Sequence, residues 1–339
     1  MTASIPVNQH ASERFFVGKR VVITGGAGYI GTAICKLLAA ADCHSITRVS
    51  RTPHAAAGGA VPFRDELGDV REAALWRRAL PGADIVFHLA GQTSNRVSDQ
   101  DPLADQAANM LPMLLCLEEC RRLGSRPRVI FAGTVTQTGL PLKLPVGEAH
   151  ADAPITFYDL HKQLAEQYLK YYSRIGAVDG VSLRLPNIYG PGPKVGSADR
   201  GILNLMIERA VSGKTLTVYG AGTQLRDYLF IDDAGGAFLA AATQAAVLSG
   251  KHFVIGTGVG HSIAQAIALV ANRVGALTGA VVPVVHVDPP EPLPMIENRS
   301  FVADIGGFTA ATGWRPQVGL AEGIERTAQA LLSRMEQPQ

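Results

Sequence analysis

The sequence has few charged and aromatic residues: of its 339 residues, 18% are charged and 6% are aromatic. Lys and Arg total 31 against 29 Asp and Glu, so the formal net charge is only +2, and no long stripe of one sign occurs. A nucleic-acid partner is therefore not expected. The four cysteines form no CxxC pair and the nine histidines form no HxH or HExxH pattern. We expect reduced, buried thiols and no metal site.

Long apolar runs are also missing. The first residues, MTASIPVNQHASERFF, lack the basic stretch and apolar core of a secretory signal. Polar residues and glycines interrupt the two long charge-free stretches, 234–250 and 252–272. We therefore expect a cytoplasmic protein with no membrane segment. Hydrophobic residues nevertheless make up 47%, enough for a sizeable core, and the length favours two lobes.

Short β-branched runs alternate with helical stretches along the first half of the chain. Strands are predicted at 21–24, 45–50, 84–89, 128–133 and 180–185, and helices at 29–41, 72–80, 103–123 and 156–175. This alternation predicts an α/β fold whose parallel sheet is covered on both faces. After Pro186 a loop rich in proline and glycine marks the first boundary between lobes.

A glycine turn joins the first predicted strand to the first helix. Gly25, Gly28 and Gly31 follow the strand directly, and Gly26, Gly28 and Gly31 also satisfy GxGxxG. Glycine lets the backbone approach a pyrophosphate, whose charge is met by free N–H groups and by the positive end of the helix dipole. Because the turn lies between a strand and a helix, it predicts a dinucleotide site.

The position that selects the dinucleotide is unusual. About 20 residues after the last glycine, NAD-binding folds carry a carboxylate that accepts hydrogen bonds from the adenosine ribose. This chain has Ser50 and Arg51 there. Arg51 can pair with a 2′-phosphate, which makes NADP(H) possible beside NAD(H); it can also stack on adenine or lie in solvent. Asp69, which precedes Val70 in a later loop, can bond the adenine amino group or simply cap the loop.

Tyr158 and Lys162 lie four residues apart in a helical stretch, hence on one face and within reach of a shared ligand. One ammonium at about 4 Å, in an effective dielectric near 20, lowers a tyrosine pKa by about three. Thr134 follows the fourth strand, at the sheet edge where ligands bind, and its hydroxyl is expected to bond the substrate oxygen that Tyr158 protonates or deprotonates. Thr136 is the neighbouring candidate. His161 is expected at the surface.

Together these features resemble an extended short-chain dehydrogenase/reductase of the nucleotide-sugar epimerase/dehydratase family. The resemblance spans about residues 19–327 and rests on the glycine turn from Thr24, the YxxxK pattern, and the further positions 88–91, Asn109, Thr134, 184–191, 226–227, 232–233 and 313–316. It implies a Rossmann-like doubly wound parallel sheet that holds NAD(P), and a smaller C-terminal lobe that binds a nucleoside diphosphate sugar. It also implies a homodimer formed through the helices around 103–123 and 157–174.

The resemblance also implies roles for individual residues. The cofactor is expected to contact Gly25, Gly28, Tyr29, Ile30, Ser50, Arg51, Asp69, Val70, Leu89, Ala90, Gly91, Asn109, Tyr158, Lys162 and Pro186. The sugar nucleotide is expected to contact Thr136, Asn187, Thr217, Tyr219, Arg226 and Arg299. The two arginines suit a diphosphate because guanidinium forks match phosphate oxygens, but either can instead be a structural ion-pair partner.

We therefore expect a polar tail at 1–18, a dinucleotide-binding domain at 19–186 to which 228–260 returns, and a substrate-binding lobe at 187–227 and 261–339. The expected reaction is epimerisation: Tyr158 removes a sugar hydroxyl proton while hydride passes to the nicotinamide, and hydride return to the other face of the 4-keto sugar inverts the centre. A 4-keto-sugar reductase using NADPH is the alternative, and a dinucleotide-sensing protein is the rival without chemistry. Dehydration is disfavoured, because Val135 and Thr136 stand where the dehydratases carry Asp and Glu.

Overall fold

The computed structural model describes residues 14–53, 61–193, 201–289 and 294–336. Seven parallel strands form the central sheet of the larger lobe, in the spatial order β10 (Lys251–Val254), β6 (Asp179–Leu185), β5 (Arg128–Thr134), β4 (Ile85–His88), β1 (Arg20–Thr24), β2 (Ser45–Ser50) and β3 (Phe63–Leu67). The chain order reverses between β1 and β4, so a ligand crevice is expected at the carboxyl ends of these strands. The predicted α/β fold with a doubly wound parallel sheet is confirmed.

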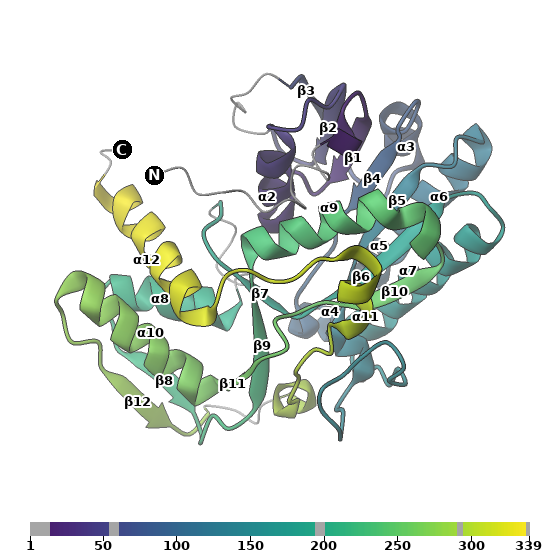
Figure 1. The fold of residues 1–339 in the computed structure, drawn as a ribbon. Coiled ribbons are helices and arrows are strands. Elements are labelled where there is room, and N and C mark those ends of the chain that lie inside the picture. The colour runs from purple at the N-terminus through teal and green to yellow at the C-terminus, as the bar shows by residue number, and fades with distance from the viewer. Residues whose placement is uncertain (1–13, 54–60, 194–200, 290–293, 337–339) are drawn as a thin grey trace.

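Helices cover both faces of this sheet (Figure 1). Val21 and Ile23 of β1 pack with α2 (Tyr29–Leu38) and α9 (Ile231–Leu248), whereas Val22 packs on the other face with α3 (Ala73–Ala79), α6 (Leu111–Leu123) and α7 (Phe157–Arg174). Because both faces are buried, the strands are hydrophobic throughout instead of alternating.

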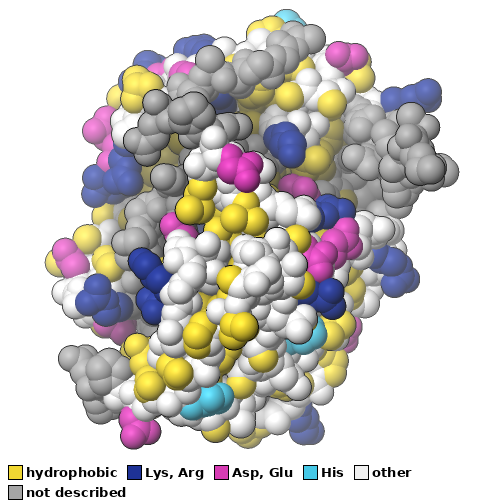
Figure 2. All heavy atoms as spheres, turned by 90° about the vertical axis from the view of Figure 1, so that its left-hand side faces the viewer, with side chains coloured by type: hydrophobic (Ala, Val, Ile, Leu, Met, Phe, Trp, Pro, Cys, Tyr) yellow, Lys and Arg dark blue, Asp and Glu magenta, His cyan; other side chains and the backbone are white. Residues whose placement is uncertain are grey.

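The smaller lobe contains two further sheets. β9 (Leu225–Phe230) lies between β11 (Gly260–Ser262) and β7 (Asn187–Tyr189), and β8 (Leu216–Tyr219) pairs with β12 (Val284–Val287). Three helices pack on them: α8 (Ile202–Val211), α10 (Ile263–Thr278) and α12 (Leu320–Glu336). On the face that carries these helices, Lys and Arg side chains are interspersed with Asp and Glu side chains and with hydrophobic ones (Figure 2).

Along the first half of the chain, the structure differs from the predicted elements at three places. The helix predicted at 103–123 is two helices, α5 (Pro102–Asn109) and α6, because Pro112 stands in the first turn of α6 and lacks an N–H group. The short helix α4 (Asn95–Gln100) precedes them and was not predicted. β3 was also missed, because its sequence FRDEL is charged where an edge strand meets solvent.

Segments from outside residues 19–186 pack in the core of the larger lobe, and one of them, β10, belongs to the 228–260 segment that was expected to return there. β10 pairs with β6, and Phe308 of α11 (Gly306–Thr312) packs with Trp314 against α9 and the central sheet. Phe16, from the predicted tail, is also buried in that cluster, while residues 1–13 lie outside the described residues. The domain limits themselves stay a prediction. None of the helices in the described ranges is long and apolar enough to span a bilayer.

Candidate active site

The glycine turn follows β1 and opens α2. Gly25 has a left-handed backbone (φ +68°), and a Cβ on it would lie 3.1 Å from the nitrogen of Ala90. A Cβ on Gly31 would lie only 2.2 Å from the carbonyl oxygen of Gly25, so glycine at this position allows α2 to pack closely against the turn. No side chain caps the first turn of α2, and no acid stands in it. Its N–H groups and the helix dipole therefore fit a pyrophosphate.

The loop after β4 is held against this turn by Thr24. The Thr24 hydroxyl accepts hydrogen bonds from the N–H groups of Leu89 and Ala90, both at 3.1 Å. Its own proton therefore goes to Nδ1 of His88, 2.8 Å away, which places the imidazole proton on Nε2. Burial lowers the pKa of His88 to about 3, in agreement with a neutral ring. These bonds fix the loop residues that are expected beside the cofactor.

Thr134, Tyr158 and Lys162 come together at the carboxyl end of β5. Thr134 is the last residue of β5, and Tyr158 and Lys162 lie on the buried face of α7. The Thr134 hydroxyl lies 2.9 Å from the Thr136 hydroxyl. A side-chain hydrogen bond from Thr134 also lowers the pKa of Tyr158. The structure thus assembles the three residues that were predicted to be catalytic.

The surroundings of Tyr158 oppose a phenolate in the free protein. Burial raises its pKa above the usual value, and the carboxylates of Asp159 and Asp105 raise it further. The hydrogen bond from Thr134 and the positive charge of Arg299 lower it. Removal of a substrate proton by Tyr158 therefore needs additional positive charge once the site is filled.

The ammonium group of Lys162 is buried against the sheet. It donates to the carbonyl oxygen of Ala132 at 2.9 Å and lies 4.7 Å from the centre of the Phe131 ring. Burial lowers the pKa of Lys162 to about 8, against the opposing effect of Asp105. The expected direct pairing of Lys162 with a Tyr158 phenolate stays a prediction, because the described hydrogen bond of Lys162 goes to the backbone.

A buried amide oxygen without a partner lies next to Gly91, where the cofactor is expected. Nδ2 of Asn109 donates to Asp105 at 2.9 Å, whereas Oδ1 is buried without a hydrogen bond. A Cβ on Gly91 would lie 2.5 Å from this oxygen and 3.5 Å from Nζ of Lys162, so only glycine is accommodated beside the two groups. A dinucleotide fits here, because its ribose hydroxyls are donors that a buried, unpaired oxygen accepts.

The residues expected at the adenosine end lie after β2 and β3. Ser50 ends β2, and Arg51 is exposed just beyond it. Asp69 accepts hydrogen bonds from Nε and Nη2 of Arg71, at 2.9 and 2.6 Å, and these bonds lower the pKa of Asp69. Asp69 is thus ion-paired within its loop in the free protein, and its bond to adenine stays a prediction.

Arg299 supplies buried donors to the opposite side of the site. It follows η2 (Met295–Asn298) and is 7% exposed, yet its Nε and Nη1 have no hydrogen-bond partner. Burial and the neighbouring Arg226 lower its pKa to about 10, whereas Asp159 and Tyr158 raise it. Buried, unpaired guanidinium donors call for an anion, and a diphosphate supplies one.

Arg226 positions the segment that carries Arg299. Its Nη1 donates to the carbonyl oxygen of Arg299, and its Nη2 donates to that of Glu297 at 2.9 Å. These bonds use the guanidinium of Arg226 for the backbone, and its Nη2 also lies 3.4 Å from the Glu297 carboxylate, the kind of ion pair that the structural alternative expects. Direct contact between Arg226 and a diphosphate stays a prediction.

The remaining expected substrate residues spread over two places. Asn187 begins β7, and Pro186 lies between β6 and β7, so both are near the carboxyl end of the large sheet. Thr217 and Tyr219 lie on β8 in the smaller lobe, where Tyr219 is 47% exposed. A sugar nucleotide that touched Asn187, Thr217 and Tyr219 would therefore extend from the large sheet to the smaller lobe, whereas Pro186 is expected beside the cofactor.

The first turn of α2 ties the two lobes together. The hydroxyl of Tyr29 donates to the carbonyl oxygen of Gly190 at 2.6 Å and accepts from Nδ2 of Asn204 at 3.1 Å. Ile30 packs against the hydrophobic clusters of both lobes. The glycine turn and the proline- and glycine-rich loop after Pro186 are thus held in one arrangement.

Comparison with known proteins identifies the family. Residues 21–256 match the sequence model of the NAD dependent epimerase/dehydratase family. The chain belongs to this family. It is 29% identical, over 91% of its length and 97% of the relative's, to a UDP-glucose 4-epimerase of Mycolicibacterium smegmatis. It is 25% identical to a dTDP-L-rhamnose 4-epimerase of Burkholderia thailandensis, over 91% of this chain and 93% of that one.

Solved structures of two UDP-glucose 4-epimerases are similar to this chain over more than nine-tenths of its length. A UDP-glucose 4-epimerase of Thermus thermophilus, in complex with NAD, superposes with a TM-score of 0.78 at 30% identity, covering 92% of this chain and 99% of that one. A UDP-glucose 4-epimerase of Thermotoga maritima, in complex with UDP-glucose, gives 0.82 at 26% identity, with 94% and 100% covered. The protein is an enzyme of the NAD-dependent epimerase/dehydratase class.

Two residues around the family's YxxxK pattern were missed or misjudged. The prediction that His161 lies at the surface is wrong: it is 6% exposed and its Nδ1 lies 2.7 Å from Asp105, because α5 packs on this side of α7. Asp159 is fully buried beside Tyr158, and burial raises its pKa. In the sequence, the only signal for a role of His161 or Asp159 was that each is a polar residue inside the YxxxK pattern.

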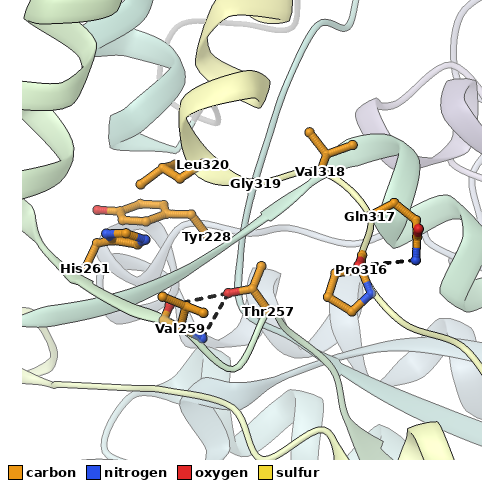
Figure 3. A pocket seen from close by; sticks show the side chains of 9 residues that line it. All are labelled: Tyr228, Thr257, Val259, His261, Pro316, Gln317, Val318, Gly319 and Leu320. Carbon is orange, nitrogen blue, oxygen red and sulfur yellow. Dashed lines mark hydrogen bonds between the residues drawn. The ribbon is translucent and has the colours of Figure 1, made fainter.

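A separate hollow of about 270 Å³ lies in the smaller lobe between β9, β11 and the start of α12. The rings of Tyr228 and His261 lie next to each other in it, close to Leu320 (Figure 3). None of the residues that line the hollow was predicted to bind cofactor or sugar, so the hollow is separate from the predicted site. No cluster of three His, Cys, Asp or Glu among the described residues could hold a metal ion.

Proposed function

We propose that this protein is an NAD-dependent 4-epimerase of nucleoside diphosphate hexoses. The observation that carries the proposal is the meeting of Thr134, Tyr158 and Lys162 at the sheet edge, between the glycine turn and the unpaired donors of Arg299. The 4-epimerase names of several relatives support the same reaction. UDP-glucose is therefore the first substrate to test.

The chain's own residues supply the proton transfer and the binding. Tyr158 takes the proton of the sugar hydroxyl at C4 and later returns it, while the Thr134 hydroxyl bonds the same oxygen. Arg299 holds the diphosphate, so the sugar stays anchored while the 4-keto form turns its other face to the site. Bound NAD would supply the acceptor for the C4 hydride and the donor for its return, so the overall reaction would leave the oxidation state of the sugar unchanged.

Water loss is not part of the proposal. Val135 cannot act as an acid, and the hydroxyl of Thr136 lies 2.9 Å from that of Thr134 instead of offering a carboxylate. The NADPH-dependent reductase would use the same Tyr158, Lys162 and Thr134. The exposed Arg51 is the observation in its favour, since it can meet a 2′-phosphate.

We infer that the cofactor choice rests on Arg51. The expected result is that Arg51→Ala weakens NADP(H) binding and leaves NAD(H) binding unchanged, measured by calorimetric titration. Equal losses for both dinucleotides would show that Arg51 does not read the phosphate.

We infer a homodimer through α5 and α7. Phe157, Leu160, Leu164 and Tyr171 follow a helical spacing along α7, and each is between 38% and 53% exposed. Leu103 of α5 is 78% exposed. Sedimentation of wild type should give a dimer, and Leu164→Glu should give a monomer. A monomeric wild type would contradict the inference.

The decisive experiment follows a panel of nucleoside diphosphate hexoses by NMR, together with the redox state of the dinucleotide. We expect conversion to the C4 epimer with no net change of NAD. Stoichiometric consumption of added NADPH with a 4-keto sugar would instead establish the reductase. Tyr158→Phe is the matched control, because it keeps the ring and removes only the hydroxyl.

A further inference from the structure

A buried carboxylate, that of Asp105, stands behind the cofactor side of the site. Its side chain is 0% exposed and accepts three hydrogen bonds: from Nδ1 of His161 at 2.7 Å, from Nδ2 of Asn109 at 2.9 Å, and from Nε2 of Gln92 at 2.9 Å. The three donors come from α7, α5 and the loop after β4. A buried charge is stable only when its oxygens are satisfied in this way.

The hydrogen bond to Asp105 decides how Asn109 faces the site. Because a carboxylate only accepts, it takes the NH2 group of the amide, and Oδ1 must point the other way. Oδ1 is the atom that lies buried without a partner next to Gly91, on the side that Nζ of Lys162 also faces. A rotated amide would present its NH2 group there, and the site would then lack this acceptor for the proton of a ribose hydroxyl.

His161 completes the arrangement from the catalytic helix. Its Nδ1 carries the proton, since Asp105 is the acceptor, and its ring stacks on Phe157 with a centroid distance of 6.2 Å. It lies between Tyr158 and Lys162 in sequence, so its bond to Asp105 links α5 to the turn of α7 that carries both.

We propose that Asp105 and His161 are positioning residues that orient the Asn109 amide, so that its oxygen is the acceptor for a ribose hydroxyl of the bound dinucleotide. The inference rests on the proposed function only in requiring that the site binds NAD. Neither residue touches the reacting atoms. Asp105 and His161 keep Oδ1 of Asn109 directed toward the ribose. Without them the amide could rotate and present its NH2 group there as often as its oxygen.

The test measures NAD affinity by calorimetry and needs no sugar substrate. Asp105→Leu keeps the side-chain size and removes the acceptor, and we expect NAD to bind about tenfold more weakly, the effect of one misplaced buried hydrogen bond. Asn109→Leu should lose a similar amount. The double variant should lose no more than either single variant, because both act through one amide. Additive losses, or an unchanged affinity in Asp105→Leu, would overturn the proposal.

A second pair of variants keeps the proposal testable if Asp105→Leu does not fold. His161→Asn retains an N–H donor close to the position of Nδ1, whereas His161→Leu removes it. We expect near wild-type NAD affinity for His161→Asn and several-fold weaker binding for His161→Leu. His44→Leu, at an exposed histidine, is the control. Equal affinities for the two His161 variants would contradict the proposal, whereas NAD binding without sugar turnover would contradict only the proposed function.

Discussion

Replacement of Lys162 by methionine is expected to make the free protein more stable while it abolishes turnover. Burial lowers the pKa of this ammonium from 10.5 to about 8. At about 1.36 kcal/mol for each pKa unit, the folded protein is destabilised by about 3 kcal/mol wherever the group is charged in both states. Methionine removes this cost but also the bond to the Ala132 carbonyl, worth about 1 kcal/mol. The free energy of unfolding of Lys162→Met at pH 7 should therefore exceed that of wild type by about 2 kcal/mol.

The pH dependence identifies the cause of the gain. Below pH 8 the lysine is protonated in the folded and the unfolded chain, so the cost is present in full. Between pH 8 and 10.5 the folded protein binds fewer protons than the unfolded chain, so wild-type stability rises with pH. At pH 9 the advantage of the variant should therefore have fallen by about 1.4 kcal/mol.

Urea unfolding of the cofactor-free protein at pH 7 and pH 9 measures both effects. Lys143→Met, at an exposed lysine, is the matched control and should show neither the gain nor its pH dependence. A Lys162→Met variant that is less stable than wild type at pH 7, or a gain that does not shrink at pH 9, would refute the reasoning.

Three further predictions concern other parts of the site and its support. Gly31→Ala should lower Tm and the content of bound dinucleotide, because its Cβ would lie 2.2 Å from a backbone oxygen, whereas Gly319→Ala, with open space, should do neither. Arg299→Met should weaken nucleotide-sugar binding at least tenfold in calorimetry and leave NAD binding unchanged. Burial raises the pKa of Glu166, but the opposing effects, of which the ion pair with Arg184 is the largest, outweigh burial and lower this pKa to about 2. Arg184→Met should therefore lower the free energy of unfolding, measured with urea, by about 3 to 5 kcal/mol. This contribution of Glu166 is present above pH 4.5 and is lost as the pH falls toward 2.

The central sheet could be predicted because its strands are buried on both faces and therefore appear as short hydrophobic runs. β2 was predicted with its observed bounds, while the charged edge strand β3 lacks that signal. The predicted 103–123 helix is split because α5 ends at Asn109 and Pro112 stands in the first turn of α6, where its missing N–H group is not needed.

The three residues proposed as catalytic could be predicted from the sequence, but their partners could not. Tyr158 and Lys162 lie in one pattern, and the structure brings Thr134 to them. That His161 is buried depends on α5, which supplies Asp105 from 56 residues away in sequence. The use of the Arg226 guanidinium by backbone carbonyls likewise depends on a segment 71 to 73 residues away. Such contacts follow from topology and not from local sequence.

The most direct test of the proposed epimerisation uses a nucleoside diphosphate hexose, first UDP-glucose, that carries deuterium at C4. If the hydride leaves C4 and returns to the same carbon, the deuterium remains at C4 of the epimer, and the rate falls because that bond breaks. NMR of the product in ordinary water should therefore show full retention of deuterium at C4, with no net change in the dinucleotide. Loss of the deuterium to water would contradict the proposed mechanism.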